Sequence, residues 1–399
     1  MSETPVDWRR NLAALWFAEF MAIFGFSFAF PFLSIFLSQD LGVRGGRDLD
    51  LWTAVAGSAS GIALAIASPV WGYLGDRYGR KPMLIRSMIG GGITVGLIYL
   101  VQSPEQLVIL RFLQGLTSGT VAAATALVAA ETPRQRVGWA LGIVTSSIAL
   151  GGAVGPVIGG IAGQLLGLRL VFLVGGIALL AAMIPVLILV RESPRKPREI
   201  SSGNVMALLR QKPGTLRTLG FLIAAQGMVS LVVTATQQLV VLRLIELLAG
   251  AATAATGAAF SAAGLANSAS AVSYTWVARR IGYVPTVVVA SMALAVTVAV
   301  LVVAPNVVVI VVAVGLTGLF NGTIVPATAA MIGLETPTET QSTVFGINAS
   351  SVAFGFFLGP LIGGGVAATS GVPSALAVVA GLAMLLSLSV AFGAREPAR

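Results

Sequence analysis

The stretch Gly72-Tyr73-Leu74-Gly75-Asp76-Arg77-Tyr78-Gly79-Arg80-Lys81-Pro82 (GYLGDRYGRKP, residues 72–82) gathers four charged residues between two long apolar segments. Elsewhere charge is scarce: 10% of the 399 residues are Asp, Glu, Lys or Arg and 56% are hydrophobic, whereas soluble proteins carry roughly 25% charged residues. Apolar segments of about 20 residues, the length that crosses a bilayer core, recur along the whole chain. The composition therefore predicts an all-α, multi-pass membrane protein in which residues 72–82 form a short loop between two spans.

We predict twelve transmembrane helices, near residues 12–38, 51–73, 83–102, 105–130, 138–165, 169–190, 217–243, 249–276, 285–304, 306–332, 340–367 and 372–393. An even number places both termini on one side. Of the 24 Lys and Arg residues, all but five then fall on the side of the termini, the exceptions being Arg44, Arg47, Arg111, Arg169 and Arg243. Because Lys and Arg favour the cytoplasmic side, we expect cytoplasmic termini. Basic loops facing anionic lipid also account for the net charge of +9, so no nucleic-acid partner is expected.

Several classes of site are disfavoured by what the sequence lacks. The chain has no Cys and no His, so we expect no disulfide, no metal or other cofactor and no histidine proton relay. None of its three lysines lies in a phosphate-binding GxxxxGK[ST] loop, which argues against ATP as the driving force. Without clustered acids a membrane enzyme is disfavoured. Any proton-exchanging side chain should be a carboxylate, working with arginine.

The two halves of the chain repeat one another. Residues 115–143 (GLTSGTVAAATALVAAETPRQRVGWALGI) resemble residues 315–347 (GLTGLFNGTIVPATAAMIGLETPTETQSTVFGI), and the pair Gly155-Pro156 recurs as Gly359-Pro360, 204 residues later. We therefore predict two six-helix bundles, residues 1–190 and 217–399, joined by a cytoplasmic linker, residues 191–216. Repeated bundles that enclose a site at mid-membrane are typical of secondary transporters that work by alternating access.

Three motifs in this order resemble those of the major facilitator superfamily: residues 72–82, Leu107-x-x-x-Arg111-x-x-Gln114-Gly115, and Gly151-x-x-x-Gly155-Pro156-x-x-Gly159-Gly160. The third resembles a motif of its twelve-helix drug/proton antiporters. The chain is most similar to bacterial multidrug efflux proteins of the MdtG type, and Glu19-Phe20 with Gly25 and Pro31 also resembles the MdfA type. The resemblance implies a monomer in a bacterial inner membrane, driven by the proton gradient, that exports lipophilic or cationic drugs.

The charged loop suggests a conformational latch. Gly72, Gly75 and Gly79 would let two helices meet over a short turn, while Arg77, Arg80 and Lys81 would keep that turn in the cytosol. Asp76 has the wrong sign for this task, and a carboxylate can bind the free N–H groups at a helix N-terminus. The resemblance implies the start of the eleventh helix, near Thr340–Thr343, as its partner. Glu131 is expected to pair with Arg77, Arg80 or Arg86. The alternative is a turn that only fixes topology.

Glu19, Arg111 and Gln114 are the candidates for proton or substrate coupling. Charges inside the membrane are costly and commonly functional, and Gln114 shares a helix face with Arg111. We expect Arg111 to bond to first-helix backbone or to a carboxylate. A buried Glu19 could exchange protons or pair with a cationic cargo, although Ser27 stands where MdfA-type helices carry a second acid. The alternatives are a structural arginine and a protonated, hydrogen-bonded glutamate.

The glycine–proline motifs, Gly151, Gly155, Pro156, Gly159, Gly160, Gly359 and Pro360, are expected to break the fifth and eleventh helices and to seal or hinge the cavity between the halves, although ordinary helix packing uses the same residues. Candidate cavity residues are Phe20, Phe24, Ser27, Gln226, Gln237, Asn267, Asn321 and Asn348. The leading hypothesis is a proton-driven exporter. A lipid or glycolipid flippase, a metabolite carrier and a non-transporting membrane sensor are the alternatives.

Overall fold

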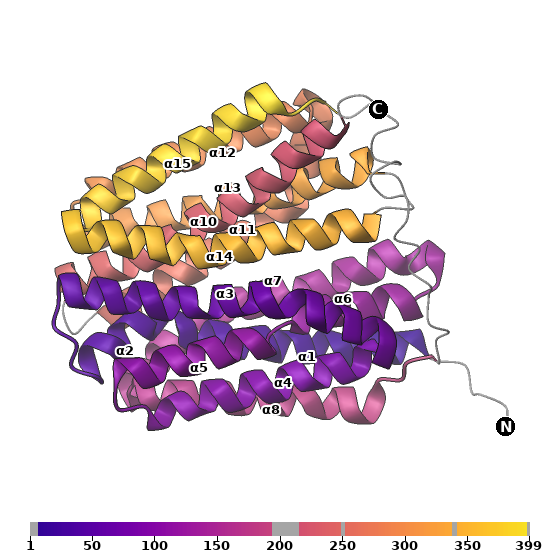
Figure 1. Ribbon diagram of the computed structural model, residues 1–399, viewed down its shortest axis with the longest axis horizontal. Helices are drawn as coiled ribbons and strands as arrows, with labels where there is room; N and C mark the ends of the chain where they lie inside the picture. Colours follow the sequence, from indigo (N-terminus) through magenta and orange to yellow (C-terminus); the bar gives the residue numbers. More distant parts are fainter. Residues whose placement is uncertain (1–6, 194–214, 249–251, 337–340, 397–399) are drawn as a thin grey trace.

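The computed structural model describes residues 7–193, 215–248, 252–336 and 341–396, and these residues are almost entirely helical (Figure 1). The elements of the first half are α1 (Trp8–Ala29), η1 (Phe30–Phe32), α2 (Leu33–Gln39), α3 (Arg47–Tyr78), α4 (Arg80–Leu97), η2 (Ile98–Leu100), α5 (Pro104–Thr117), α6 (Thr120–Glu131), η3 (Arg134–Arg136), α7 (Val137–Leu166) and α8 (Leu168–Leu189). Those of the second half are α10 (Thr215–Leu248), α11 (Ala252–Ile281), α12 (Tyr283–Val302), α13 (Val307–Glu335), α14 (Gln341–Ser370) and α15 (Val372–Gly393).

Two of the predicted spans are irregular. The first bends through the short 3-10 helix η1, where Pro31 lacks the N–H that would continue α1. The fourth is interrupted between α5 and α6, where Ser118 is extended and Gly119 has a φ of +128°. When α1, η1 and α2 are counted together as one rod, and α5 and α6 as another, the described residues form twelve rods, as predicted.

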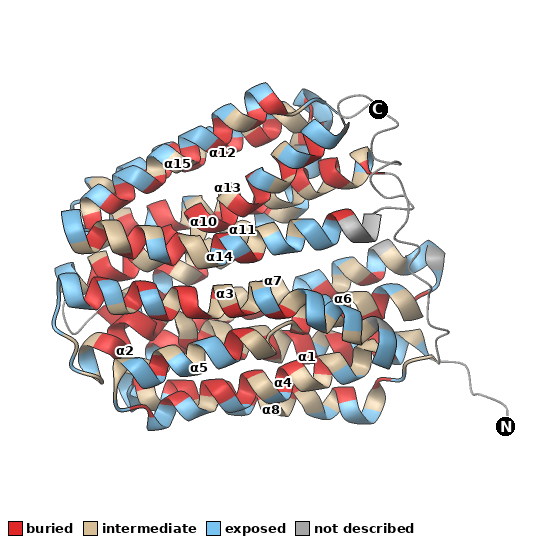
Figure 2. Ribbon diagram, in the orientation of Figure 1, coloured by how far each residue is buried: buried red, intermediate tan, exposed pale blue. Residues whose placement is uncertain are grey.

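Eleven of these rods, within the described residues, are long and apolar enough to cross a membrane, so the chain is a multi-pass membrane protein. The remaining rod, α11, is equally long but rich in Ala, Ser and Thr. Figure 2 shows buried stripes on the faces where rods meet and exposed residues on the outer faces. In a membrane, those outer faces would contact lipid.

Four reversals of the chain use a single glycine each. Gly79, Gly167, Gly282 and Gly371 have φ values of +102°, +86°, +97° and +83°, a region that L-residues with a β-carbon avoid, and each lies directly between two helices. The predicted short turn after Tyr78 is therefore confirmed for Gly79. Gly72 and Gly75 lie inside α3, so their assignment to the turn was wrong: the helix extends five residues beyond its predicted end.

The elements form two groups, α1–α8 and α10–α15, that lie one above the other in Figure 1. α3 packs against α14, and α7 packs against α11, across the boundary between the groups. The end of the molecule where α1 begins and α15 ends is called the termini end below, and the opposite end the far end. This boundary is where the candidate site lies.

Candidate functional site

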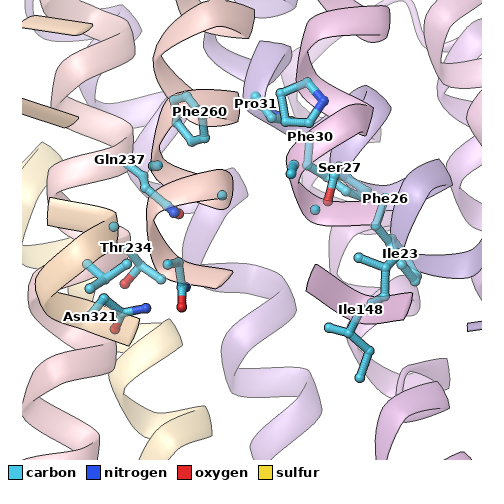
Figure 3. A pocket seen from close by; sticks show the side chains of 18 of the residues that line it. Ile23, Phe26, Ser27, Phe30, Pro31, Ile148, Thr234, Gln237, Phe260 and Asn321 are labelled. Atoms are coloured by element: carbon cyan, nitrogen blue, oxygen red, sulfur yellow. The ribbon is translucent and has the colours of Figure 1, made fainter. Parts of the chain in front are cut away.

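A cavity of about 1110 Å³ lies between the two groups and is lined by residues of both. In the close-up of Figure 3, Ile23, Phe26, Phe30 and Ile148 form an apolar wall on one side. Across the cavity the second group presents Thr234, Gln237, Phe260 and Asn321. The cavity therefore has one mainly apolar wall and one wall that combines apolar and neutral polar side chains.

The cavity is closed at the far end by close backbone contacts. A β-carbon on Gly364 of α14 would lie 2.5 Å from Cβ of Ala54 and 2.8 Å from the carbonyl oxygen of Asp50, both in the far-end part of α3. A β-carbon on Gly257 of α11 would lie 2.5 Å from the carbonyl oxygen of Pro156 in α7. Farther along α11, toward the termini end, the lining residue Val272 is 80% exposed. The cavity is therefore open toward the termini end.

Arg111 lines the cavity and is fixed by a polar cluster. Its Nε donates to the carbonyl oxygen of Ala56 (3.2 Å), one Nη donates to the side-chain oxygen of Gln114, and the other donates to Ser60 Oγ (2.7 Å). The guanidinium lies 4.3 Å from the ring centroid of Phe30, a cation–π contact. The structure thus brings Arg111 and Gln114 together. The expected bond to first-helix backbone or a carboxylate was wrong, because α3 supplies the carbonyl and hydroxyl instead.

Glu19 is completely buried in α1 and does not line the cavity. Neither of its carboxyl oxygens has a hydrogen-bond partner within the described part of the chain. Burying an unpaired polar group is costly, so this carboxyl group is an unusual feature of the core. Its position separates it from any cargo held in the cavity, so a direct ion pair with cargo is not available in this conformation.

Half of the predicted cavity residues line it: Ser27, Gln237, Asn267 and Asn321. Phe20, Phe24, Gln226 and Asn348 do not. The backbone of α1 at Phe20 and Phe24 packs against Gly151 of α7, and Gln226 donates to the carbonyl oxygen of Val325 (2.9 Å), linking α10 to α13. Helix packing therefore explains the positions of three of the four predicted residues that do not line the cavity.

Several cavity residues were missed by sequence reasoning, including Phe26, Phe30, Ser60, Gln238 and Phe260. For Phe26 and Phe30 a signal existed, since both lie within a turn or two of Ser27 on the aromatic-rich first helix. Ser60 and Gln238 carry no local signal. They line the cavity because α3 and α10 face the boundary between the two groups at those positions.

The glycine–proline motif of α7 has two packing faces. On one face, β-carbons on Gly151 and Gly155 would lie 2.8 Å from the Phe20 carbonyl oxygen and from Ser27 Cβ of α1, and Gly159 makes a similar approach to Phe28. On the other face, Pro156 and Gly160 contact α11 in the second group. The motif therefore packs α7 onto α1 and onto the opposite half at once.

The copy of this motif in α14 packs in the same manner. Gly355 and Gly359 approach the backbone of α10, while Pro360 approaches Gly57 of α3 in the first group. The predicted breaks at Pro156 and Pro360 were wrong, because α7 and α14 continue through both prolines. Each proline lacks the N–H that would bond to the carbonyl four residues earlier, and a membrane helix tolerates this loss where neighbouring helices pack closely around it. Separately, the Gln238 side chain of α10 donates to the Pro360 carbonyl oxygen (3.4 Å).

The latch itself lies outside the described residues, since the side chains of Asp76 and of residues 341–343, and all of Thr340, are not described. The surrounding loop is held by other contacts. Lys81 Nζ donates to the carbonyl oxygen of Val190 (2.7 Å), Arg80 donates to that of Ala126, and Arg77 stacks on Tyr78 (5.4 Å).

Three glutamates stabilise the termini end through backbone groups. Glu131, which was expected to pair with arginine, accepts bonds from the backbone N and the Oγ of Ser193 (3.1 and 2.7 Å). Glu192, which sequence reasoning missed, accepts bonds from the backbone N of Arg80 and Lys81 (2.9 Å each) and so caps α4. Glu396 likewise caps α12, and its spacing of 204 residues from Glu192 matches the internal repeat. That spacing was the missed signal.

Comparison with known proteins identifies the family. A sequence profile of the Major Facilitator Superfamily matches residues 15–242 and 240–399. The chain belongs to this superfamily. It is 29% identical to the multidrug resistance protein MdtG of Klebsiella pneumoniae (100% of this chain, 96% of MdtG) and 31% identical to that of Dickeya zeae (96% and 93%).

Solved superfamily structures share the fold. A mutant of the nucleoside transporter NupG superposes with a TM-score of 0.79 at 13% identity, covering 96% of this chain and 99% of NupG. The human organic anion transporter MFSD10 superposes with a TM-score of 0.73 at 18% identity, covering 96% and 99%. The expectation of a superfamily member resembling MdtG efflux proteins is confirmed.

Proposed function

We propose that this superfamily member exports lipophilic small molecules in exchange for protons, as a monomer in the bacterial cytoplasmic membrane with its termini end in the cytoplasm. The observation that carries the proposal is the central cavity, which is closed at the far end and reached from the termini end. Its volume of about 1110 Å³ is slightly larger than that of ordinary ligand sites, roughly 300–1,000 Å³. A cavity of this size between two helical groups suits alternating access.

The lining supports a lipophilic cargo. Aliphatic and aromatic side chains such as Ile23, Phe26 and Phe260 alternate with isolated amides and hydroxyls. Apolar walls with few polar groups accept ligands of varied shape, because they impose few directional requirements. The relatives named as multidrug resistance proteins add weight to an export role.

Glu19 supports coupling to protons. An ionised carboxyl group without a partner is costly to bury, so a change in the protonation of Glu19 should require α1 to rearrange. Residues of α1 also line the cavity and pack on α7, which contacts the opposite half. Protonation of Glu19 would therefore affect cargo binding through the position of α1. Arg111 and Gln114 of α5 line the same cavity.

The proposal is tested by flux measurements in sealed liposomes that contain the purified protein. The initial rate of movement of a neutral fluorescent lipophile, N-phenyl-1-naphthylamine, is measured with and without an imposed pH gradient. We expect the gradient to accelerate export by the wild type and to have little effect on Glu19→Gln. Glu105→Gln, which alters an exposed carboxylate at the start of α5, is the matched control and should behave as wild type.

Two outcomes would count against the proposal. If the protein moves none of a panel of lipophiles, the export role is wrong. If export is equally fast with and without the gradient, or if Glu19→Gln keeps full gradient dependence, proton coupling through this residue is wrong.

A further inference from the structure

The charge of the cavity lining is unusual for a site expected to hold cations. Arg111 is the only ionisable side chain among the described residues that line the cavity. No carboxylate of the described chain lines it, and Glu19, the one carboxylate buried deep in α1, lies elsewhere. A lipophilic cation in this cavity would meet a positive charge and no negative partner.

Arg111 is rigidly placed and still has hydrogen-bonding capacity. Three of the five N–H groups of a guanidinium are engaged, by Ala56, Gln114 and Ser60. Two N–H groups therefore remain for a ligand. Because the three partners are neutral, none of them cancels the positive charge of Arg111.

The opposite wall carries neutral polar groups. Gln237, Asn267 and Asn321 line the cavity from α10, α11 and α13, and Gln237 and Asn321 lie across from the α1 wall in Figure 3. Amides can donate to a carbonyl, sulfonyl or carboxylate oxygen and accept from a hydroxyl. They satisfy neutral or anionic oxygen-bearing ligands, but they do not neutralise a cation.

We infer that the cavity selects neutral and anionic lipophilic molecules over lipophilic cations, with Arg111 as the residue that determines charge specificity. This inference rests on the proposed export function and narrows its cargo, which the sequence alone had extended to cations. A unit charge about 8 Å from a guanidinium, at an effective dielectric constant of ~20, changes affinity about 30-fold relative to a neutral ligand. Opposite signs of ligand charge shift affinity in opposite directions.

The test compares two ions of matched size and shape. Tetraphenylborate and tetraphenylphosphonium differ chiefly in the sign of their charge, and triphenylphosphine oxide serves as a neutral, oxygen-bearing probe. Binding to the full-length protein in lipid nanodiscs is measured by equilibrium dialysis, with empty nanodiscs subtracted. We expect the anion to bind at least tenfold more tightly than the cation, with the neutral probe between them.

Three variants assign the preference to the cavity. Arg111→Gln should bring the anion and cation within about threefold of each other, whereas Arg111→Lys should keep a preference for the anion. Asn321→Asp, which places a carboxylate in the lining without changing side-chain size, should raise cation affinity at least tenfold. Asn348→Asp introduces the same group outside the lining and should leave the preference unchanged. Gel filtration of each variant verifies folding before binding is compared.

The outcomes separate this inference from the export proposal. If the wild type binds and transports the cation as well as the anion, and Arg111→Gln changes both equally, the charge inference is overturned while export stands. If none of the three probes binds and no lipophile is transported, the export proposal fails together with the inference.

Discussion

Replacement of Gly257 by alanine should shift the protein away from the conformation described here. A β-carbon at this position of α11 would lie 2.5 Å from the Pro156 carbonyl oxygen of α7. Ordinary contact requires at least about 3.4 Å, so the two helices must separate by roughly 0.9 Å or distort, and such overpacking typically costs ~1–3 kcal/mol. Under the proposed alternating access this contact is lost when the far end opens, so we expect the cost to fall on the closed state alone.

The expected shift is large enough to measure. A coupling of ~1–3 kcal/mol corresponds to a change of about 5- to 150-fold in the ratio of the two conformations. The chain has no cysteine, so spin labels can be placed on introduced cysteines without background. Exposed positions Leu165 and Val303 report on the far end, one in each half, and their distance distribution is measured in nanodiscs by pulsed electron resonance.

We expect Gly257→Ala to increase the population with a long Leu165–Val303 distance. Gly381→Ala is the matched control, because it makes the same exchange within the exposed face of α15 and its new β-carbon would meet no atom within 4 Å. The exchange of glycine for alanine raises helix propensity equally in both variants, so they differ only in the close contact that the new β-carbon of Gly257→Ala makes with Pro156. If the distance distributions of Gly257→Ala, Gly381→Ala and wild type are indistinguishable, the far-end contact does not control the conformation.

Other predictions concern stability, measured as the apparent Tm of the purified protein. Arg169 donates to the carbonyl oxygens of Tyr99 and Val101 (2.9 and 2.7 Å), so Arg169→Ala should destabilise the fold by about 1–3 kcal/mol, and an unchanged Tm would show that these bonds are dispensable. Glu192→Ala and Glu396→Ala each remove a carboxylate cap from two backbone N–H groups and should each cost ~0.5–2 kcal/mol. If the apparent Tm falls in only one of these two variants, the two caps do not contribute equally to stability.

The arrangement of helices was predictable from sequence because apolar length and short glycine turns are local properties. The predicted spans differ from the observed helices mainly at their ends, and the turn at Gly79 follows from its own backbone requirement. The interruption at Ser118 and Gly119 was missed, since one glycine in an apolar segment is compatible with a continuous helix.

The site was predictable only where one helix carries the information. Arg111 and Gln114 meet because they are three residues apart on α5, whereas their partners Ala56 and Ser60 belong to α3 and follow from packing between helices. Glu19 has the burial expected of it, but sequence could not tell that its side chain is excluded from the cavity. Which faces of twelve helices converge is a property of the whole assembly.

The most direct test of alternating access is to measure spin-label distances at both ends of the wild-type protein under the same conditions. Spin labels at Tyr78 and Ile281, exposed at the termini ends of α3 and α11, complement the Leu165–Val303 pair at the far end. When the pH is changed between 5 and 8, or when a transported lipophile is added, the two distances should change in opposite directions. Distances that stay fixed under all these conditions, or that lengthen and shorten together, would contradict alternating access about the central cavity.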